Sequence, residues 1–180
     1  MKIIAFTGMP FAGKTEAVQL AEEMKIPVVR MGDAVWEEVK KRRLPLNEKT
    51  VGSVANEMRN THGMDIWAQR TVERIRTIPK TEYVVIDGIR NREEVEFFKK
   101  NLGKDFIIVA IDASTDVRKQ RARDRKRVDD GATMHSFEER DKRELRWGLG
   151  EVIASADIVI PNEHDKKSFQ TLVKQVLQRL

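Results

Sequence analysis

The sequence predicts a three-layer α/β/α fold, in which a five-stranded parallel sheet lies between two layers of helices. Two observations lead to this prediction. Apolar runs rich in valine and isoleucine recur along the chain, and segments with a helical spacing of apolar residues separate them. Helices cover both faces of a parallel sheet, so its strands contain near-continuous apolar runs of this kind.

The apolar runs define five strands in chain order. Each run has the length of a strand and is rich in β-branched residues. The predicted strands are 2–6 (KIIAF), 26–31 (IPVVRM), 83–88 (YVVIDG), 106–112 (FIIVAID) and 156–161 (ADIVIP).

Helical patterns fill the segments between the strands. Residues 15–25 and 165–180 each place apolar side chains three or four positions apart, so that one face of a helix is apolar. Because strands and helices alternate, we expect right-handed crossovers and helices on both faces of the sheet.

Two longer stretches contain no predicted strand. Residues 34–76 have the pattern of two or three consecutive helices, which we expect to form a helical insert over the acceptor side of the site. Residues 118–150 are intensely polar, and we expect them to form a lid. No linker or internal repeat is evident, so the sequence predicts one domain over residues 1–180.

Composition narrows the class of protein. The 180 residues are 40% apolar and 35% charged, with a formal net charge of +5 and a pI near 9.5, which favours anionic partners such as nucleotides, coenzymes or nucleic acid. The absence of cysteine excludes disulfides and thiolate metal sites. No apolar run is long enough for a membrane span and no signal peptide is evident, so we expect a cytoplasmic protein.

The segment between the first strand and the first helix contains a complete phosphate-binding motif. Gly8, Gly13, Lys14 and Thr15 match G-x-x-x-x-G-K-[ST]. Glycines let the backbone curl so that its amides point at phosphates, and the following helix adds the positive end of its dipole. We expect Lys14 to reach the β- and γ-phosphates and Thr15 to bind Mg²⁺. The predicted nucleotide-binding residues of the loop are Gly8, Met9, Pro10, Phe11, Ala12, Gly13, Lys14 and Thr15.

Two aspartates follow other predicted strands at the edge where α/β proteins bind ligands. Asp33 has two interpretations: it caps the next helix, or it orients or deprotonates an acceptor hydroxyl. Asp87 is placed to hold Mg²⁺ together with Thr15. These aspartates indicate phosphoryl transfer rather than phosphate binding alone.

Arginines supply the remaining candidates. Arg90 follows Asp87 closely and can hold an acceptor phosphate as a planar fork. Arg121 and Arg125 are four positions apart on one helix face, where they can flank a base and grip phosphates, and Arg140 lies beyond them. Cations that close over the transferring group neutralise its charge and exclude water. The predicted catalytic residues are Lys14, Asp33, Asp87, Arg90, Arg125 and Arg140.

These motifs resemble those of nucleoside-monophosphate kinases, including adenylate kinase and dephospho-CoA kinase. GMPFAGKT looks like the adenylate kinase loop, MGDAVWEEV and DGIR look like the turns around its acceptor, and SADIVIPNE is similar to the end of dephospho-CoA kinases. DGIRNREEVEFF and RDKRELRWGLGEVIASAD resemble the archaeal UPF0200 family of adenylate kinase-related P-loop proteins. The resemblance implies a P-loop NTPase fold, ATP and Mg²⁺ as cofactors, and contact between Asn162 and adenine.

Two positions depart from the adenylate kinase pattern. Trp36 stands where those enzymes usually place an arginine for the AMP phosphate, and Phe11 stands at a position that is commonly glycine. Trp36 can stack on a base or an aromatic acceptor, or it can belong to the core or an interface. The missing arginine argues against AMP as the acceptor.

The sequence therefore predicts an ATP-dependent kinase that transfers the γ-phosphate to a nucleotide or nucleotide-like coenzyme. The alternative is an ATP-binding switch or slow ATPase that docks on RNA or a protein, which the high pI and the arginine-rich segment favour. Against RNA, no aromatic residue lies between Arg118 and Asp130 for base stacking. No Asn-Lys-x-Asp stretch is present to read guanine, and the sequence leaves the oligomeric state open.

Overall fold

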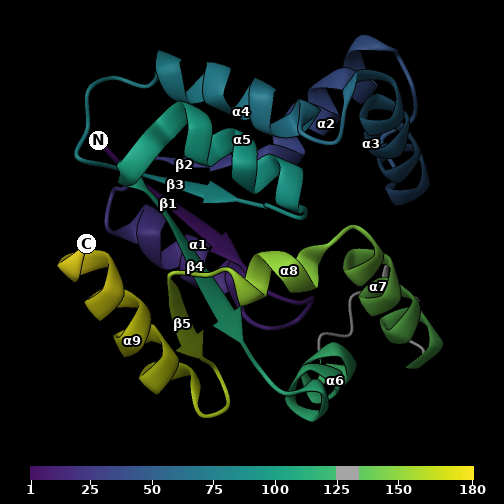
Figure 1. The fold of residues 1–180 in the computed structure, drawn as a ribbon. Helices are drawn as coiled ribbons and strands as arrows, with labels where there is room; N and C mark the ends of the chain where they lie inside the picture. The colour runs from purple at the N-terminus through teal and green to yellow at the C-terminus, as the bar shows by residue number, and fades with distance from the viewer. Residues whose placement is uncertain (125–133) are drawn as a thin grey trace.

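A computed structural model describes residues 1–124 and 134–180, without the side chains of residues 48 and 134–136. Five parallel strands form one sheet in the order β2-β3-β1-β4-β5 (Figure 1). The predicted five-stranded parallel sheet between layers of helices is therefore confirmed. The strands are β1 (Lys2–Thr7), β2 (Val28–Arg30), β3 (Tyr83–Asp87), β4 (Phe106–Asp112) and β5 (Ile158–Pro161).

Side chains of β1 alternate between two hydrophobic cores. Ile4 and Phe6 point to the face covered by α1 (Lys14–Glu23) and α9 (Lys166–Arg179). Ile3 and Ala5 belong to the second core, which the helices on the opposite face of the sheet complete. The helices that contribute to this second core include α2 (Met31–Lys41), α3 (Glu48–His62), α4 (Ile66–Thr77), α5 (Arg92–Leu102) and α8 (Leu149–Ala154).

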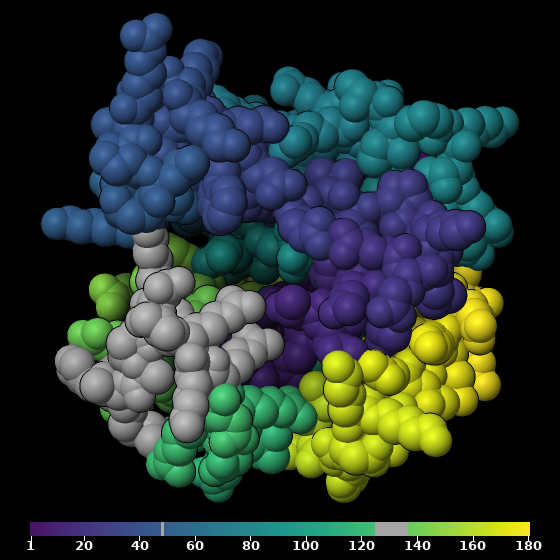
Figure 2. All heavy atoms as spheres, turned by 180° about the vertical axis from the view of Figure 1, so that it is seen from behind, coloured from purple at the N-terminus to yellow at the C-terminus, as the bar shows by residue number. Residues whose placement is uncertain are grey.

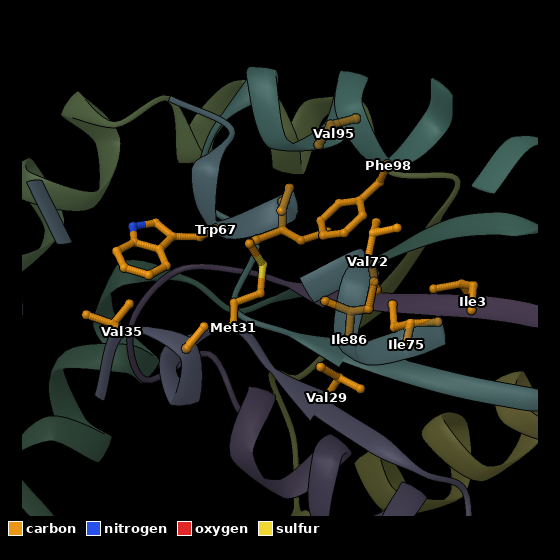
Figure 3. Packing of buried hydrophobic residues seen from close by; sticks show 14 of the residues in the cluster. Ile3, Val29, Met31, Val35, Trp67, Val72, Ile75, Ile86, Val95 and Phe98 are labelled. Carbon is orange, nitrogen blue, oxygen red and sulfur yellow. The ribbon is translucent and has the colours of Figure 1, made fainter. Parts of the chain in front are cut away.

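The second core holds the insert against the sheet. Trp67 of α4 and Phe98 of α5 are almost fully buried and pack with Met31, the first residue of α2 (Figure 3). Burial of one such side chain contributes about 1.5–3 kcal/mol. The indole Nε1 of Trp67 also donates a hydrogen bond to the carbonyl oxygen of Ala55 in α3 (3.3 Å). The three helices of the insert are therefore packed to one another and to the sheet.

Strand register brings the carboxyl ends of the strands to one edge. Phe6 of β1 pairs with Asp87 of β3, and Arg30 of β2 pairs with the same aspartate. Asp112 of β4 pairs with Pro161 of β5 farther along the sheet. The arrowheads of β1, β3 and β4 point to the side of the molecule where α3 and α7 (Met134–Arg146) lie (Figure 1). Residues that follow these strands can therefore meet.

The polar stretch 118–150 is largely helical where the structure describes it. α6 (Thr115–Asp124) precedes residues 125–133, which lie outside the described residues, and α7 and α8 follow them. A short 3-10 helix, η1 (Gly103–Asp105), precedes β4. Within the described part of the chain, no helix is both long and apolar enough to span a bilayer.

Candidate functional site

The glycine-rich loop lies between β1 and α1, as the sequence predicts, and two of its positions require glycine. Gly8 has φ +144°, and a Cβ atom there would lie 2.3 Å from the carbonyl oxygen of Ile111. Gly13 has φ +120°, and its Cβ atom would lie 2.3 Å from Nδ2 of Asn162. The loop therefore passes so close to the ends of β4 and β5 that no side chain fits at either position.

Side chains from the C-terminal half of the chain hold the loop carbonyls. Nδ2 of Asn162 donates to the carbonyl oxygen of Ala12 (2.7 Å), and Arg121 donates to the same oxygen (3.2 Å) and to the Asn162 carbonyl oxygen (2.8 Å). Arg118 donates to the carbonyl oxygen of Pro10 (3.1 Å). The predicted nucleotide ligands Arg121 and Asn162 thus lie against the loop and fix its backbone. Arg125, predicted beside Arg121, lies outside the described residues.

Lys14 is the first residue of α1, and its amine turns back into the loop. Nζ donates to the carbonyl oxygens of Gly8 and Met9, the latter at 3.2 Å. Protein atoms closely surround the amine, and this burial lowers the pKa of Lys14 from 10.5 to about 8. Lys14 therefore begins to lose its proton at a pH close to neutrality, well below the pH at which an ordinary lysine does so.

Four further charged groups act on the Lys14 amine from other parts of the chain. Asp87 and Glu144 favour its charged form, whereas Arg90 and Arg140 oppose it. Three of these residues, Asp87, Arg90 and Arg140, are predicted catalytic residues. The structure thus brings four of the six predicted catalytic residues into one electrostatic cluster, together with Glu144, which was not among the predicted site residues.

The two candidate aspartates lie at the ends of neighbouring strands. Burial raises the pKa of Asp87, the last residue of β3, although Lys14, Arg30 and Arg90 counteract this effect. Asp33 is close enough to raise the Asp87 pKa further. The cap interpretation of Asp33 is wrong, because the N-cap of α2 is Arg30 and Asp33 lies exposed in the first turn. A carboxylate in that turn still interacts favourably with the helix dipole.

The groups available for a metal ion are few. Thr15 is exposed at the second position of α1, and Asp87 lies at the end of the adjacent strand. Among residues 1–124 and 134–180, no group of three or more His, Cys, Asp or Glu side chains is arranged to hold a metal. The donor set fits Mg²⁺ bound mainly by phosphate oxygens and water, because Mg²⁺ commonly takes only one or two protein ligands.

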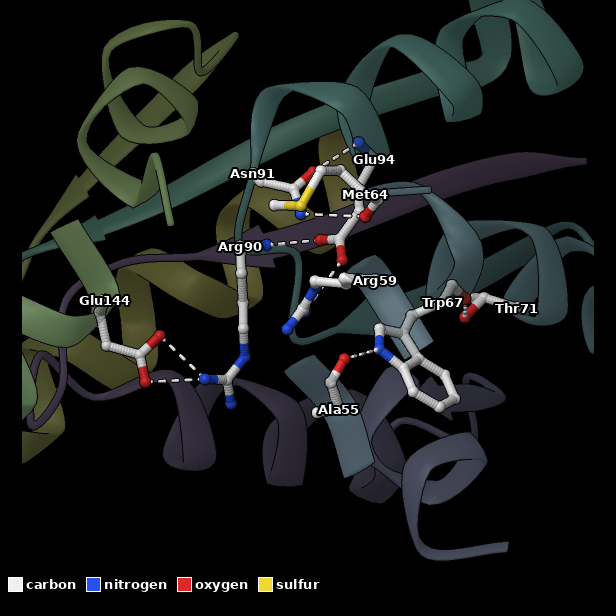
Figure 4. A network of polar contacts seen from close by, with 9 residues as sticks. All are labelled: Ala55, Arg59, Met64, Trp67, Thr71, Arg90, Asn91, Glu94 and Glu144. Atoms are coloured by element: carbon white, nitrogen blue, oxygen red, sulfur yellow. Dashed lines mark hydrogen bonds and ion pairs between the residues drawn. The ribbon is translucent and has the colours of Figure 1, made fainter. Parts of the chain in front are cut away.

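Arg90, the predicted acceptor arginine, is paired with α7 (Figure 4). One guanidinium nitrogen donates to both carboxylate oxygens of Glu144, at 2.7 and 2.9 Å. The backbone N–H of Arg90 donates to Glu94 (2.8 Å), whose other carboxylate oxygen accepts from Arg59 (3.2 Å). Glu94 is fully buried, and this burial raises its pKa. Arg90 is therefore fixed at both its backbone and its side chain.

Trp147, at the end of α7, gathers three arginines. The guanidinium groups of Arg59 and Arg90 each lie 5.2 Å from the centre of its ring, and that of Arg143 lies 5.8 Å away. The face of an aromatic ring attracts cations, and each such contact contributes about 0.5–2 kcal/mol. Trp147 thus connects α3, the turn after β3, and α7.

A second aromatic contact joins α7 to the phosphate loop. Phe11 adopts a left-handed backbone conformation (φ 63°), and its ring stacks on Phe137 of α7 with a centroid distance of 5.9 Å. The guanidinium of Arg140 lies 5.4 Å from the Phe11 ring, which places this predicted catalytic residue at the loop. Both carboxylate oxygens of Asp141 accept hydrogen bonds from Arg118 (2.8 and 2.7 Å). The described part of the predicted lid therefore packs on the loop.

Glu144, Asp141 and Trp147 were not among the predicted site residues. A usable signal was present, because Phe137, Arg140, Glu144 and Trp147 are three or four positions apart and share one face of a helix. Trp36 is 54% exposed, so its interpretation as a core residue is wrong.

The fold and the loop geometry define a P-loop protein with a kinase-like fold. A family model described as an AAA domain matches residues 7–138. The structure is similar to a shikimate kinase from Bacteroides thetaiotaomicron (TM-score 0.62, 14% identity, 99% of each chain). It is also similar to a gluconokinase from Sinorhizobium meliloti 1021 (TM-score 0.60, 17% identity, 99% of this chain and 92% of the other). At such low identity these likenesses establish the fold alone.

The chain belongs to the UPF0200 family. It is 45% identical over 177 residues to a UPF0200 protein of Methanosarcina acetivorans, with 98% of this chain and 94% of the relative covered. It is 43% identical over 181 residues to a UPF0200/UPF0201 protein of Archaeoglobus fulgidus; the match covers all of this chain but only 56% of that longer relative. The resemblance seen in the sequence is thereby confirmed.

Proposed function

We propose that this protein is an ATP- and Mg²⁺-dependent phosphotransferase that moves the γ-phosphate to a nucleotide or a nucleotide-like coenzyme. The observation that carries the proposal is the group of charged side chains beside the phosphate loop: Asp87 ends the strand next to β1, Arg140 lies over the ring of Phe11, and Arg90 is paired with Glu144. The shikimate kinase and gluconokinase with the same fold support the class of reaction. We expect the reaction in the cytoplasm, where its nucleotide substrates occur.

On the ATP side, the loop amides would bind the phosphates and the Lys14 amine would exchange its loop carbonyl partners for phosphate oxygens. Thr15 would bind Mg²⁺, and Asp87 would hold it through water. When bound, Mg²⁺ neutralises charge on the phosphate oxygens. The remaining contribution of the protein is positioning and electrostatics, which account for most of the catalysis of phosphoryl transfer.

On the acceptor side, Arg90 and Arg140 would hold anionic groups and Asp33 would orient the attacking oxygen. If that oxygen belongs to an alcohol, its proton would pass to the Asp33 carboxylate as its bond to the γ-phosphorus forms and the bond from that phosphorus to the bridging oxygen breaks, which releases ADP. One guanidinium nitrogen of Arg90 already binds both oxygens of the Glu144 carboxylate, so this side chain accepts an anion at the position where an acceptor phosphate would lie. The acceptor would therefore replace Glu144 as the partner of Arg90.

A screen of acceptors tests this proposal. The protein is incubated with Mg²⁺, γ-labelled ATP and, in separate reactions, each nucleoside monophosphate or dephospho-CoA. We expect label to appear in one acceptor and to be absent with the Lys14→Ala variant. Slow loss of ATP without a labelled acceptor, combined with salt-sensitive RNA binding, would instead favour an ATP-binding switch.

A further inference from the structure

A cavity of about 530 Å³ lies between α3 and α7, outside the cluster around Lys14. Its lining combines an indole, an amide and charged side chains. The lining residues are Asn56, Glu139, Lys142, Arg143, Arg146 and Trp147. A cavity of this size is within the range of small-molecule sites and can hold a diphosphate with part of a nucleoside. On the face seen in Figure 2, the surface is hollowed between the blue insert and the purple N-terminal segment, which includes the phosphate loop.

The charge of the cavity favours an anion. Three cationic side chains line it, against the single carboxylate of Glu139. Lys142 and Arg146 are exposed and lie four positions apart on α7, so their charged groups reach the same side of the helix. Cations that converge on one cavity with excess positive charge bind phosphate groups well.

Trp147 belongs both to the cavity lining and to the surroundings of Arg90, the predicted acceptor arginine. That indole lines the cavity and also contacts the guanidinium of Arg90, which acts electrostatically on Lys14. Arg59 forms an ion pair with Glu94, and Arg90 forms one with Glu144. A ligand whose reacting group lies at Arg90 can therefore extend past Trp147 into the cavity.

We propose that this cavity is a second anion subsite, which holds a phosphate or diphosphate of the acceptor that is not transferred. This inference rests on the proposed function and selects within it: the acceptor is a nucleotide-like coenzyme whose own phosphate lies apart from the reacting group, rather than a nucleoside monophosphate. Lys142 and Arg146 bind that phosphate, and no bond is made or broken in the subsite.

Calorimetry without ATP tests the subsite. Dephospho-CoA, which contains a diphosphate, and AMP are titrated separately into the wild-type chain and into the double variant Lys142→Ala/Arg146→Ala. We expect wild type to bind dephospho-CoA more tightly than AMP, and the double variant to lose about tenfold or more for dephospho-CoA while the AMP affinity stays within about twofold. A matched control, Lys99→Ala/Lys100→Ala, removes two exposed charges from α5 and should change neither affinity.

Three results would overturn the proposal: equal affinity of wild type for both ligands, equal losses for both ligands in the double variant, or dephospho-CoA binding by the double variant that matches the control. Loss of RNA binding with unchanged dephospho-CoA binding would also overturn it. Charge reversal with Lys142→Glu/Arg146→Glu should enlarge the loss, and circular dichroism checks the fold of each variant. Retained dephospho-CoA binding in Lys14→Ala separates this subsite from the phosphate loop, so the subsite stands even if no acceptor is phosphorylated.

Discussion

The phosphate loop and the arginine cluster around Trp147 are both cationic, but their charges are organised differently. The loop uses backbone geometry: Gly8 and Gly13 permit its path, and one lysine supplies the charge. The cluster uses side chains from three segments, stacked on one indole and paired with Glu94 and Glu144. The phosphate loop therefore has its folded conformation before any ligand binds, whereas the arginines of the cluster are already paired with carboxylates of the protein itself.

This difference predicts that ATP binds more readily than the acceptor does. A preformed loop loses little conformational entropy when a nucleotide binds, apart from the exchange of partners at Lys14. An acceptor at Arg90 has to displace the Glu144 carboxylate, which makes two hydrogen bonds to that guanidinium. ATP binding should therefore depend on one side chain, and acceptor binding on a competition.

Lys14→Ala removes the charge of the phosphate loop and should have the largest effect on binding. The variant loses a charge-assisted contact with phosphate, and we expect ATP binding to weaken by about 3 kcal/mol, which is a factor of about 100. Calorimetry with a non-hydrolysable ATP analogue measures this loss. Lys174→Ala on α9 removes an exposed lysine and serves as the control. A folded Lys14→Ala protein with normal affinity would contradict the assignment of the loop.

Arg90→Ala removes the predicted acceptor arginine from the cluster around Trp147. We expect kcat/KM for the acceptor to fall about 10–100-fold, because a charge-assisted contact with the acceptor is lost, while KM for ATP changes less than about twofold. Steady-state kinetics with each substrate varied in turn separates the two values. Arg92→Ala is the matched control, because Arg92 lies two residues away and pairs with Glu96 on the surface of α5. Equal losses for both substrates would indicate that Arg90 has only a structural role.

The difference between the two regions also decides how much the sequence could reveal. The fold was predictable because each strand carries its own apolar pattern: the fourth strand was predicted at 106–112 and observed as Phe106–Asp112. The second strand was predicted at 26–31 and is observed as Val28–Arg30; its C-terminal end is set by α2, which begins at Met31. The phosphate loop was predictable for the same reason, since its residues are contiguous and each has a local role.

The arginine cluster was not predictable, because its partners are far apart in the chain. Arg90 pairs with Glu144 across 54 positions, and Arg59 pairs with Glu94 across 35. Among 34 basic and 29 acidic residues, sequence alone does not indicate which pairs form.

Asp33 was ambiguous for a local reason, because aspartate is common both at the N-cap and in the first turn of a helix. The roles predicted for the site residues remain predictions.

The pKa of Lys14 gives a smaller test of the loop, through pH. Its value in the folded protein, about 8, lies below the 10.5 expected of an unfolded chain. Between these values the unfolded chain binds more protons, so this group makes the protein more stable as pH rises from 8 to 10.5. Nucleotide binding requires the charged amine, so we expect the affinity to fall about tenfold from pH 7 to pH 9.

The same experiment detects the proton directly. Calorimetry in buffers with different ionisation enthalpies should show proton uptake on nucleotide binding at pH 9 and little uptake at pH 7. Lys14→Ala removes the titrating group, and its residual binding should show no such uptake. Affinity that stays constant from pH 7 to pH 9 in the wild-type protein would contradict a lowered pKa for Lys14.

Glu144→Gln tests whether the Glu144 carboxylate competes with the acceptor for Arg90, and it has the smallest expected effect. The amide keeps the shape of the buried side chain but removes the charge that competes for Arg90. If the acceptor displaces Glu144, the variant should bind the acceptor more tightly, by about threefold to fivefold, although it unfolds at a lower temperature because a partly buried ion pair is lost.

Opposite changes in affinity and stability distinguish competition from structural support, since a purely structural carboxylate would lower both together. Acceptor KM and thermal unfolding of the same preparation measure the two quantities, and a rise in KM with the fall in stability would show that the cluster supports the acceptor site rather than occupying it.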